Sequence, residues 1–436
     1  MMIHLFVLLA IGGLMQAARS FAPAAAHAGG TELAFGFLLL AAYFTGKIFN
    51  KVGLPKLTGY IVAGIVTGPA VLELVTKPMT LQLKLVGSVA TSILALEAGA
   101  ELNLRAMRSQ LGTVARITIF SVFGTMIVLC GTLILLRPLV PFLGNLPMEH
   151  AIPVAACMSI ALSAQSPAVV MALIAETRAD GSLTRMILAL VVVADLAIIV
   201  SYGIASSAAT SIINGNVDFY EAVGGIGWEV FGSIGVGIFI GFVLGAFLIY
   251  INQGVGLFTI MVCLVVAEVG NALHLDPLII LLTGGLWLEN VSRADARQLV
   301  HQFAQASLPF YLVFFALAGA KLDLHALYTL ALPVAIIVMT RGTSFFVMGK
   351  VATSGPNVEP IIKKMSWLGL LPQAGLALAL AELVRRTFPQ FGDAVFALVV
   401  GVVATNELVA PVILRIALLR SGEAGRRPDN GGAASH

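Results

Sequence analysis

Hydrophobic segments separated by short polar loops recur along the chain, from about residue 31 to residue 418. A helix of about 20 predominantly apolar residues can cross a bilayer, because the hydrocarbon core is about 30 Å thick. The pattern therefore predicts an all-α polytopic membrane protein with about 13 transmembrane helices. The predicted spans are residues 31–49, 58–75, 82–101, 113–136, 151–176, 184–210, 224–250, 256–273, 278–290, 303–320, 330–350, 364–385 and 391–418.

The first 30 residues form a segment of their own. Met1–Gln16 carries an apolar run, and the small residues within 24–29 (AAAHAG) resemble a signal-peptidase site. Residues 1–30 are therefore predicted to be either a cleaved signal peptide or an extra N-terminal helix. The functional interpretation does not depend on which of the two holds.

The loop charges predict the orientation of the spans. If residue 31 starts outside, the cytoplasmic loops and span ends hold Lys51, Lys56, Arg105, Arg108, Arg178, Arg185, Arg293, Arg297, Lys350, Lys363, Lys364, Arg415, Arg420, Arg426 and Arg427. The outer side holds Lys77, Lys84, Arg137, Lys321, Arg385 and Arg386. The cytoplasmic side therefore holds more Lys and Arg residues than the outer side, which agrees with the positive-inside rule. We therefore predict a short cytoplasmic tail at residues 419–436. The expected location is the bacterial inner membrane.

A sequence repeat relates the two halves of the chain. Residues 98–104 (AGAELNL) recur 220 positions later as residues 318–324 (AGAKLDL). Pro55 and Pro277 open glycine-containing helices 44 and 42 residues before the glycine of each copy. Equivalent helices of the two copies are seven predicted spans apart. Because seven is an odd number, the second copy crosses the membrane in the opposite direction to the first.

The repeat predicts an inverted-topology architecture, which many secondary transporters share. The first repeat is predicted at residues 31–210 and the second at residues 256–418. Residues 224–250 form the predicted linking helix between them.

Each half contains one span that is interrupted near its middle. Residues 163–167 (SAQSP) interrupt the first, and Pro372, Gln373 and Gly375 interrupt the second. Proline removes a backbone donor and frees a carbonyl. Non-helical backbone at membrane depth occurs only where it is buried in protein or lines a cavity. We therefore predict two unwound helices that cross with freed carbonyls facing a site; a simple proline kink in each helix is the alternative.

Asp195 lies about eleven residues inside its predicted span, among apolar neighbours. A carboxylate at that depth costs about 3 kcal/mol or more unless it is protonated, paired or hydrated, so it is a functional candidate. A carboxylate removed from water can hold either a proton or a cation near neutral pH. Because one such group cannot hold a proton and a cation at once, it couples the movement of protons across the membrane to that of the cation. The alternative is a structural aspartate that anchors a polar network.

Two further charges are deep in the predicted spans. Arg341 is the deepest cation, and its permanent charge needs an anion or water nearby. Glu407 is a second deep carboxylate, 212 residues after Asp195 and close to the repeat-equivalent position. The sequence leaves two interpretations open: a structural Arg341–Glu407 pair that braces the core, or charge-balancing roles in transport.

Composition and motifs exclude several functional classes. The chain is 59% hydrophobic and 11% charged, and no basic run indicates binding to nucleic acid. No HExxH motif, His/Cys group or phosphate-binding loop occurs, so we predict neither a metal centre nor ATP coupling. The chain is therefore predicted to be a transporter without cofactors rather than an enzyme.

Several segments resemble the monovalent cation:proton antiporter-2 family. Residues 53–64 (GLPKLTGYIVAG), followed by Gly68 and Pro69, are similar to its opening signature. The remaining similar segments are residues 96–103 (LEAGAELN), residues 165–170 (QSPAVV), Leu183-Thr184-Arg185 with Asp195 ten residues later, and Thr340-Arg341-Gly342. The resemblance spans about residues 31–418.

The resemblance implies a dimerising panel and a mobile core that work by an elevator-like movement. It implies that Asp195 binds a cation and a proton in turn, with oxygens from Gln165 and Ser166 and charge balance from Arg341. Ser163 is a further candidate ligand in the same interruption. One departure is Ala194, where family members commonly have Asp, Asn or Gln. A single carboxylate predicts electroneutral one-for-one exchange.

The predicted function is thus secondary-active exchange of Na⁺ or K⁺ for protons by a lipid-embedded homodimer. A sodium-coupled organic-anion symporter of a related inverted-repeat fold is the main alternative, although the interrupted segments are sparse in anion-binding groups. A gated cation channel is a third possibility, but no pore loop or ring-forming motif is evident.

Overall fold

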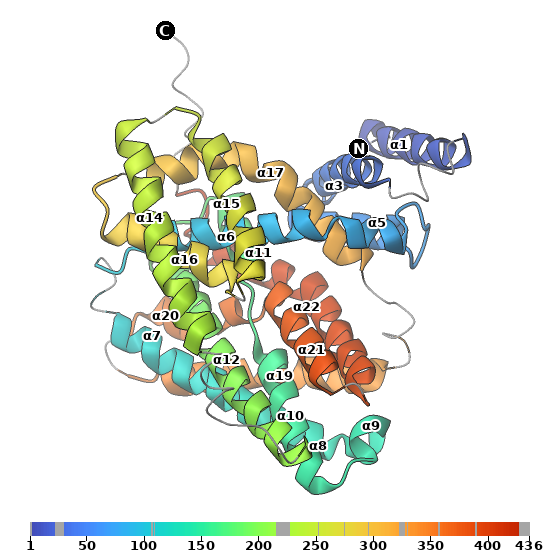
Figure 1. Cartoon of the computed structure of the whole chain (residues 1–436), viewed down its shortest axis with the longest axis vertical. Coiled ribbons are helices and arrows are strands. Elements are labelled where there is room, and N and C mark those ends of the chain that lie inside the picture. Colours follow the sequence, from blue (N-terminus) through green and yellow to red (C-terminus); the bar gives the residue numbers. More distant parts are fainter. Residues whose placement is uncertain are drawn as a thin grey trace. The chain divides into compact units, whose positions relative to one another are not determined.

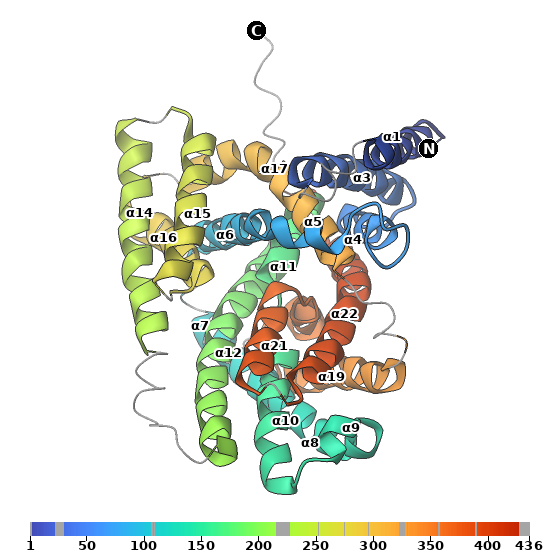
Figure 2. The ribbon, with the colours of Figure 1, turned by 45° about the vertical axis from the view of Figure 1, so that its right-hand side comes forward.

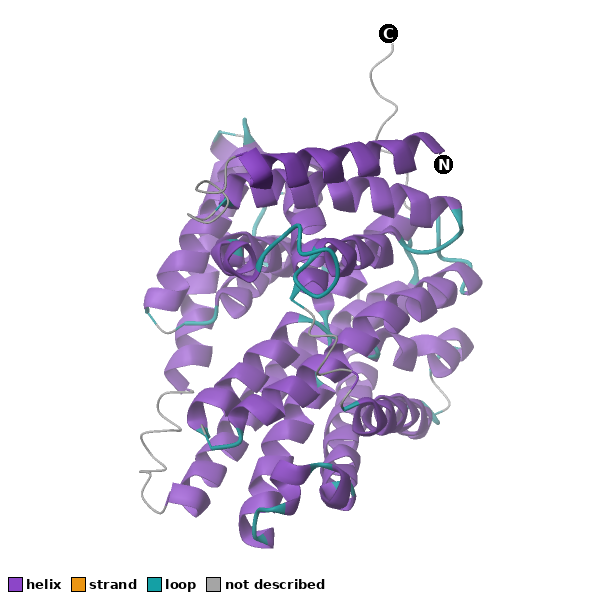
Figure 3. Cartoon of the chain, turned by 90° about the vertical axis from the view of Figure 1, so that its right-hand side faces the viewer, coloured by secondary structure: helices purple, strands orange, loops and turns teal. Residues whose placement is uncertain are grey.

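The computed structural model describes residues 2–21, 30–105, 108, 110–214, 227–251, 253–273, 275–294, 296–321, 328, 330–355, 358–388 and 390–426. The described residues form helices joined by loops, and none of them forms a strand (Figure 3). This is the expected result for a chain whose long segments are apolar, because a helix satisfies its own backbone hydrogen bonds within a bilayer.

The chain divides into two compact units. Unit 1 comprises residues 1–101, 237–273 and 280–323, and unit 2 comprises residues 102–236, 274–279 and 324–436. Each unit thus draws on both halves of the sequence, and each contains segments from both predicted repeats.

Unit 1 contains the N-terminal helices and the helices that carry the sequence repeat (Figure 1). Its helices are α1 (Met2–Phe21), α3 (Thr31–Lys51), α4 (Lys56–Thr67), α5 (Lys77–Gln82), α6 (Lys84–Glu101), most of α14 (Ser233–Tyr250), α15 (Val255–Ala272), most of α16 (Pro277–Asn290) and α17 (Ala296–Ala320). α1 packs against α3, and Met15 is buried there. The predicted leader is therefore helical over residues 2–21, whereas residues 24–29 lie outside the described residues.

α4 and α17 approach each other closely through glycines. A Cβ atom on Gly64 of α4 would overlap the carbonyl oxygen of Ala316, and a Cβ atom on Gly319 of α17 would overlap the carbonyl oxygen of Ile61. Only a residue without a side chain allows this approach of two backbones. Gly319 belongs to the second copy of the sequence repeat.

α6 and α16 make the reciprocal contact. A Cβ atom on Gly99 of α6 would overlap the carbonyl oxygen of Leu282, and one on Gly285 of α16 would overlap that of Leu96. Each proline-opened helix therefore packs against the repeat-bearing helix of the other half of the chain.

Unit 2 contains both interrupted spans and the helices packed against them. Its helices are α7 (Leu111–Thr118), η1 (Ile119–Phe123), α8 (Gly124–Leu135), η2 (Arg137–Leu139), α9 (Pro141–Gly144), α10 (Met148–Ser163), α11 (Pro167–Thr177), α12 (Ser182–Asn214), η3 (Trp228–Gly232), α19 (Ala331–Ala352), α20 (Pro360–Met365), η4 (Ser366–Leu370), α21 (Gly375–Thr387) and α22 (Gly392–Arg420). α10 packs against α8, α12, α21 and α22, and α19 also packs against α22 (Figure 2). One apolar core joins these helices, with Val154, Ala194, Ile337, Leu380 and Val399 among its members.

Seven helices within the described residues are long and apolar enough to cross a membrane, or eight if the bent pair α20–η4 and α21 counts as one span. The other predicted spans coincide with helices that do not meet both criteria over their described residues, so the count of 13 stays a prediction. The predicted span 58–75 is too long, because α4 ends at Thr67. Gly68 is extended there, as expected for the residue before Pro69.

Candidate cation-binding site

The first interruption lies between α10 and α11. α10 ends at Ser163, residues 164–166 have no regular structure, and α11 starts at Pro167. Proline suits the first helical position because its missing N–H would have no partner there. The Ser166 hydroxyl caps α11 by accepting a hydrogen bond of 3.2 Å from the Val169 N–H. Residues 163–166 are all buried, so the non-helical backbone is enclosed by protein.

The second interruption lies between η4 and α21. Residues 371–374 have no regular structure, and the helical segments on either side are bent by 42°. Pro372 lies inside the interruption, and Gly375 starts α21. Residues 371–374 are buried, like those of the first interruption.

Arg341 of α19 binds both interruptions at once. Its guanidinium donates from Nε to the Leu162 carbonyl (2.9 Å) and from Nη2 to the Ala164 carbonyl (2.9 Å). It also donates from Nη1 to the Leu371 carbonyl (2.7 Å) and from Nη2 to the Leu370 carbonyl (3.0 Å). The side chain is only 1% exposed, so its charge is balanced by these oxygens and the partial negative charge of the helix ends.

A second contact between the interruptions runs through two amides. Gln373 Nε2 donates to the Leu162 carbonyl (2.7 Å), which Arg341 also binds. Asn406 of α22 then donates from Nδ2 to Gln373 Oε1 (2.7 Å). Both amide side chains are buried. Asn406 was not among the predicted site residues, and it joins α22 to the crossing.

Five buried side-chain oxygens in the described part of unit 2 have no hydrogen-bond partner, and two of them lie on or beside the interrupted spans. Gln165 donates from Nε2 to the Ser163 carbonyl (2.6 Å), while its Oε1 has no partner. Asp195 of α12 is half-buried, and its Oδ1 is buried without a partner. α12 packs against α10, α11, η4 and α21, so Asp195 lies on a helix that contacts both interrupted spans.

This arrangement suits a monovalent cation better than a polar network closed on itself. Unwound backbone and half-helix ends coordinate Na⁺ and H⁺ sites in secondary transporters. An unpaired buried oxygen costs free energy unless a ligand, water or proton satisfies it. No group of three or more His, Cys, Asp or Glu side chains that could hold a resident metal occurs in the described residues.

The comparison with protein families covers nearly the whole chain. Residues 36–420 match the family described as "Sodium/hydrogen exchanger, transmembrane". The chain belongs to the sodium/hydrogen exchanger family. As a member of this family of cation/proton antiporters, it is an integral membrane transporter and not an enzyme.

Two solved structures of the sodium proton antiporter MjNhaP1 from Methanocaldococcus jannaschii have a similar fold. The structure at pH 8 is 15% identical, with 89% of this chain and 95% of that chain covered and a TM-score of 0.63. The structure from a 3D EM map is 16% identical, with coverage of 88% and 96% and a TM-score of 0.71. No curated protein sequence matches the chain. At this identity the likeness shows a shared fold.

Two other predicted site residues of this sodium/hydrogen exchanger, Ser163 and Glu407, make no side-chain hydrogen bond to the opposite interruption among the described residues. The Ser163 hydroxyl donates to the Ile160 carbonyl within α10 (2.8 Å). Glu407 is 2% exposed on α22, next to Asn406. Within the part of the chain that is described, Arg341 and Glu407 form no ion pair, because the guanidinium donates to carbonyls instead. The Arg341–Glu407 pair, which was one of the two interpretations that the sequence left open, is therefore not formed.

Asp276 is a further carboxylate of unit 2 that was not among the predicted site residues. Its Oδ1 accepts hydrogen bonds from the N–H groups of Leu278 (2.7 Å) and Ile279 (3.4 Å) at the start of α16. It therefore caps that helix. The Asp276-Pro277 pair is the feature of the sequence that could have predicted this cap, because Asp often precedes a helix and Pro often begins one.

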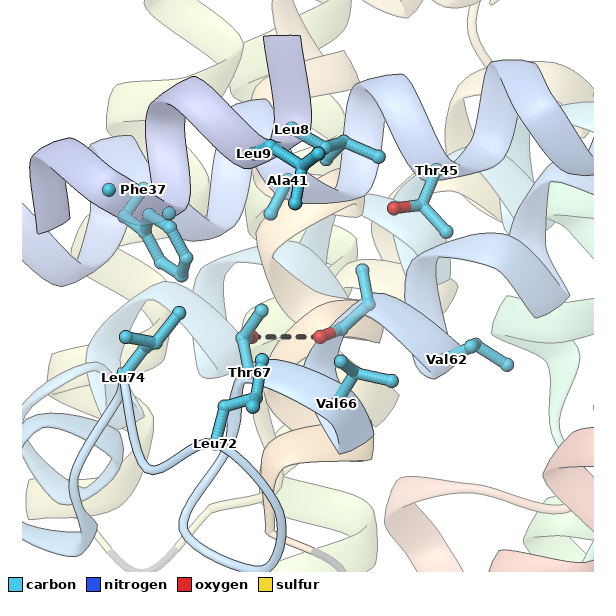
Figure 4. A pocket seen from close by; sticks show the side chains of 13 residues that line it. Leu8, Leu9, Phe37, Ala41, Thr45, Val62, Val66, Thr67, Leu72 and Leu74 are labelled. Carbon is cyan, nitrogen blue, oxygen red and sulfur yellow. Dashed lines mark hydrogen bonds between the residues drawn. The ribbon is translucent and has the colours of Figure 1, made fainter. Parts of the chain in front are cut away.

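A cavity of about 380 Å³ in unit 1 is a poor candidate for the cation site of the exchanger. Figure 4 shows side chains of α1, α3 and α4 and of the loop after α4 around it. Its walls are apolar apart from Thr45 and Thr67, and the Thr67 hydroxyl donates to the Ala63 carbonyl (2.8 Å). None of the described residues that line this cavity is a carboxylate, so none of them could exchange a proton for a cation.

Proposed function

We propose that the chain is an electroneutral monovalent cation/proton antiporter, exchanging Na⁺ or K⁺ for H⁺ at Asp195. The observation that carries the proposal is the pair of buried interruptions bound by one arginine, with α12 packed against both. Gln165 Oε1 and Asp195 Oδ1 supply oxygens that have no other partner. Ser166 adds a hydroxyl and Ser163 a carbonyl oxygen in the same interruption.

The charge balance of the site supports one-for-one exchange. The Arg341 charge is offset by the carbonyl ends of α10 and η4. Asp195 then contributes one negative charge, which either a proton or a monovalent cation neutralises. Both loaded forms carry the same net charge, so a complete cycle moves no net charge across the membrane. Glu407 is proposed to balance charge from α22 without binding the transported ion.

The architecture supports alternating access by movement of one unit. Both interruptions, Arg341 and Asp195 belong to unit 2, so the site can be carried as one body. The reciprocal glycine contacts of unit 1 are those expected for two inverted repeats, residues 31–210 and 256–418. We propose an elevator-like movement of unit 2, with unit 1 as the dimerising panel of a homodimer in the inner membrane.

The sequence motifs favour the antiporter-2 branch of the exchangers, and this finer assignment is part of the proposal. The organic-anion symporter is less well supported, because four N–H groups of the deep Arg341 already bind backbone carbonyls. An organic anion needs free donors, and Arg341 has few to offer.

Exchange in reconstituted vesicles tests the proposal. We expect external Na⁺ or K⁺ to drive proton efflux from acid-loaded vesicles, and Asp195→Asn to abolish it. Lowering the pH should raise the half-saturating cation concentration, because protons then occupy the shared carboxylate. Asp393→Asn is the matched control, since that carboxylate is 94% exposed on α22. Full exchange by Asp195→Asn would refute the assignment.

A further inference from the structure

The segment that follows α22 folds back onto the corner between α11 and α12. The Glu423 carboxylate accepts hydrogen bonds from the N–H groups of Leu183 (2.8 Å, to Oε1) and Thr184 (2.8 Å, to Oε2). Its Oε2 also accepts one from the Thr184 hydroxyl (2.6 Å). These three bonds lie in the first turn of α12, and Glu423 is only 4% exposed.

Backbone contacts hold the same segment in place. The Asp180 N–H donates to the Glu423 carbonyl (3.1 Å), and the Gly425 N–H donates to the carbonyl of Thr177, the last residue of α11 (2.9 Å). A Cβ atom on Gly181 would overlap the Glu423 carboxyl group. The corner is therefore shaped to receive this side chain, and we call residues 421–425 the C-terminal latch.

The latch contacts α11, which begins directly after the proposed ligands Gln165 and Ser166, and α12, which carries Asp195. α11 is the second half of the first interrupted span, and α12 carries Asp195 thirteen positions after its first residue. At 1.5 Å per residue, Asp195 lies about 20 Å along the helix from the latch. A helix is stiff over that length, so its first turn influences where Asp195 lies.

The carboxylate of Glu423 is well suited to bind the N–H groups at the start of α12. A carboxylate at a helix N-terminus satisfies N–H groups that have no partner within the helix and interacts favourably with the helix dipole. Charge-assisted hydrogen bonds of this kind are about twice as strong as neutral ones. Few other side chains could accept all three bonds.

We propose that Glu423 is a positioning residue for cation binding: through the C-terminal latch it sets the place of α12, and hence of Asp195, relative to the first interruption. This inference rests on the proposed function of Asp195. Loosening the latch displaces one ligand of the cation without removing it, so apparent affinity falls more than the maximal rate.

The chain offers a graded series of variants. Glu423→Ala removes all three bonds, whereas Glu423→Gln keeps one acceptor oxygen and turns an amide N–H group toward a backbone donor. Thr184→Val removes the hydroxyl bond and preserves the side-chain shape. The matched control is Glu359→Gln, because Glu359 is an exposed carboxylate that accepts one hydrogen bond from Ser182 at the same helix start (2.5 Å).

Two measurements on the full chain test the inference. In proteoliposomes containing equal amounts of folded protein, we expect the half-saturating Na⁺ concentration to rise about tenfold in Glu423→Ala and about threefold in Glu423→Gln and Thr184→Val. The maximal rate should change less than the affinity, and Glu359→Gln should match the wild type. Hydrogen exchange should show faster exchange of the Leu183 and Thr184 amides in Glu423→Ala.

The outcomes separate this inference from the proposed function. If the wild type exchanges no monovalent cation, the proposed function fails, whatever the amides show. If the wild type exchanges cations and Glu423→Ala loses amide protection at unchanged Na⁺ affinity, the latch is structural and the inference is wrong. An equal effect of Glu359→Gln would also overturn it. Should Glu423→Ala fold poorly, the same comparison is made with Glu423→Gln and Thr184→Val.

Discussion

Replacement of Arg341 by glutamine tests the joint between the two interrupted spans. The buried guanidinium makes four hydrogen bonds to backbone carbonyls, and glutamine can make at most two. Each charge-assisted bond contributes about 1.5–3 kcal/mol net, but their sum overestimates the effect because neighbouring groups relax. Glutamine leaves at least two buried carbonyls without a donor, each at a cost of about 1–3 kcal/mol, so we expect the unfolding free energy to fall by about 3–5 kcal/mol.

The assay is thermal unfolding of the purified protein in detergent, followed by vesicle exchange. A loss of that size should lower the melting temperature by roughly 5–10 °C, and exchange should be abolished. Arg341→Lys should be intermediate, because one ammonium cannot span both interruptions. The control is Arg385→Gln, whose ion pairs with Glu382 and Asp393 are at least partly exposed to solvent and contribute about 1 kcal/mol or less. Equal melting temperatures for Arg341→Gln and Arg385→Gln would refute the reasoning.

Three further substitutions test other parts of the structure. Gln165→Leu removes an unpaired oxygen of the first interruption, and the half-saturating cation concentration should rise about tenfold or more in vesicle exchange. Asn406→Leu leaves Gln373 without its donor, and the unfolding free energy should fall by about 1–3 kcal/mol, measured as a lower melting temperature. Gly64→Ala forces α4 away from Ala316 and should destabilise by about 1–3 kcal/mol, whereas Gly131→Ala, with no atom within 4 Å of the new Cβ, should not.

The sequence carried a local signal for both interruptions. Proline next to small polar residues within an apolar run predicted breaks at residues 163–167 and 372–375, and the structure has them at residues 164–166 and 371–374. Asp195 and Arg341 stood out because charge in a long apolar segment is costly. The early end of α4 had a signal too, in Gly68-Pro69, but the apolar residues after it suggested a longer span.

Other features of the site have no local signal. The four acceptors of Arg341 are backbone carbonyls, which every residue possesses, so the sequence suggested Glu407 as a partner instead. Asn406 and Gln373 are 33 positions apart, and Glu423 lies 239 positions after Thr184. Such contacts depend on how the helices pack, and neither periodicity nor spacing along one chain reveals them.

Proton release on cation binding tests most directly whether one carboxyl group binds H⁺ and the cation in turn. Purified protein in weakly buffered detergent solution is titrated with NaCl or KCl, with choline chloride as the control, and the pH is recorded. If Asp195 exchanges one ligand for the other, the wild type releases up to about one proton per chain and Asp195→Asn releases none. Equal release by both proteins, or saturable Na⁺ binding by the wild type without any release, would contradict the account.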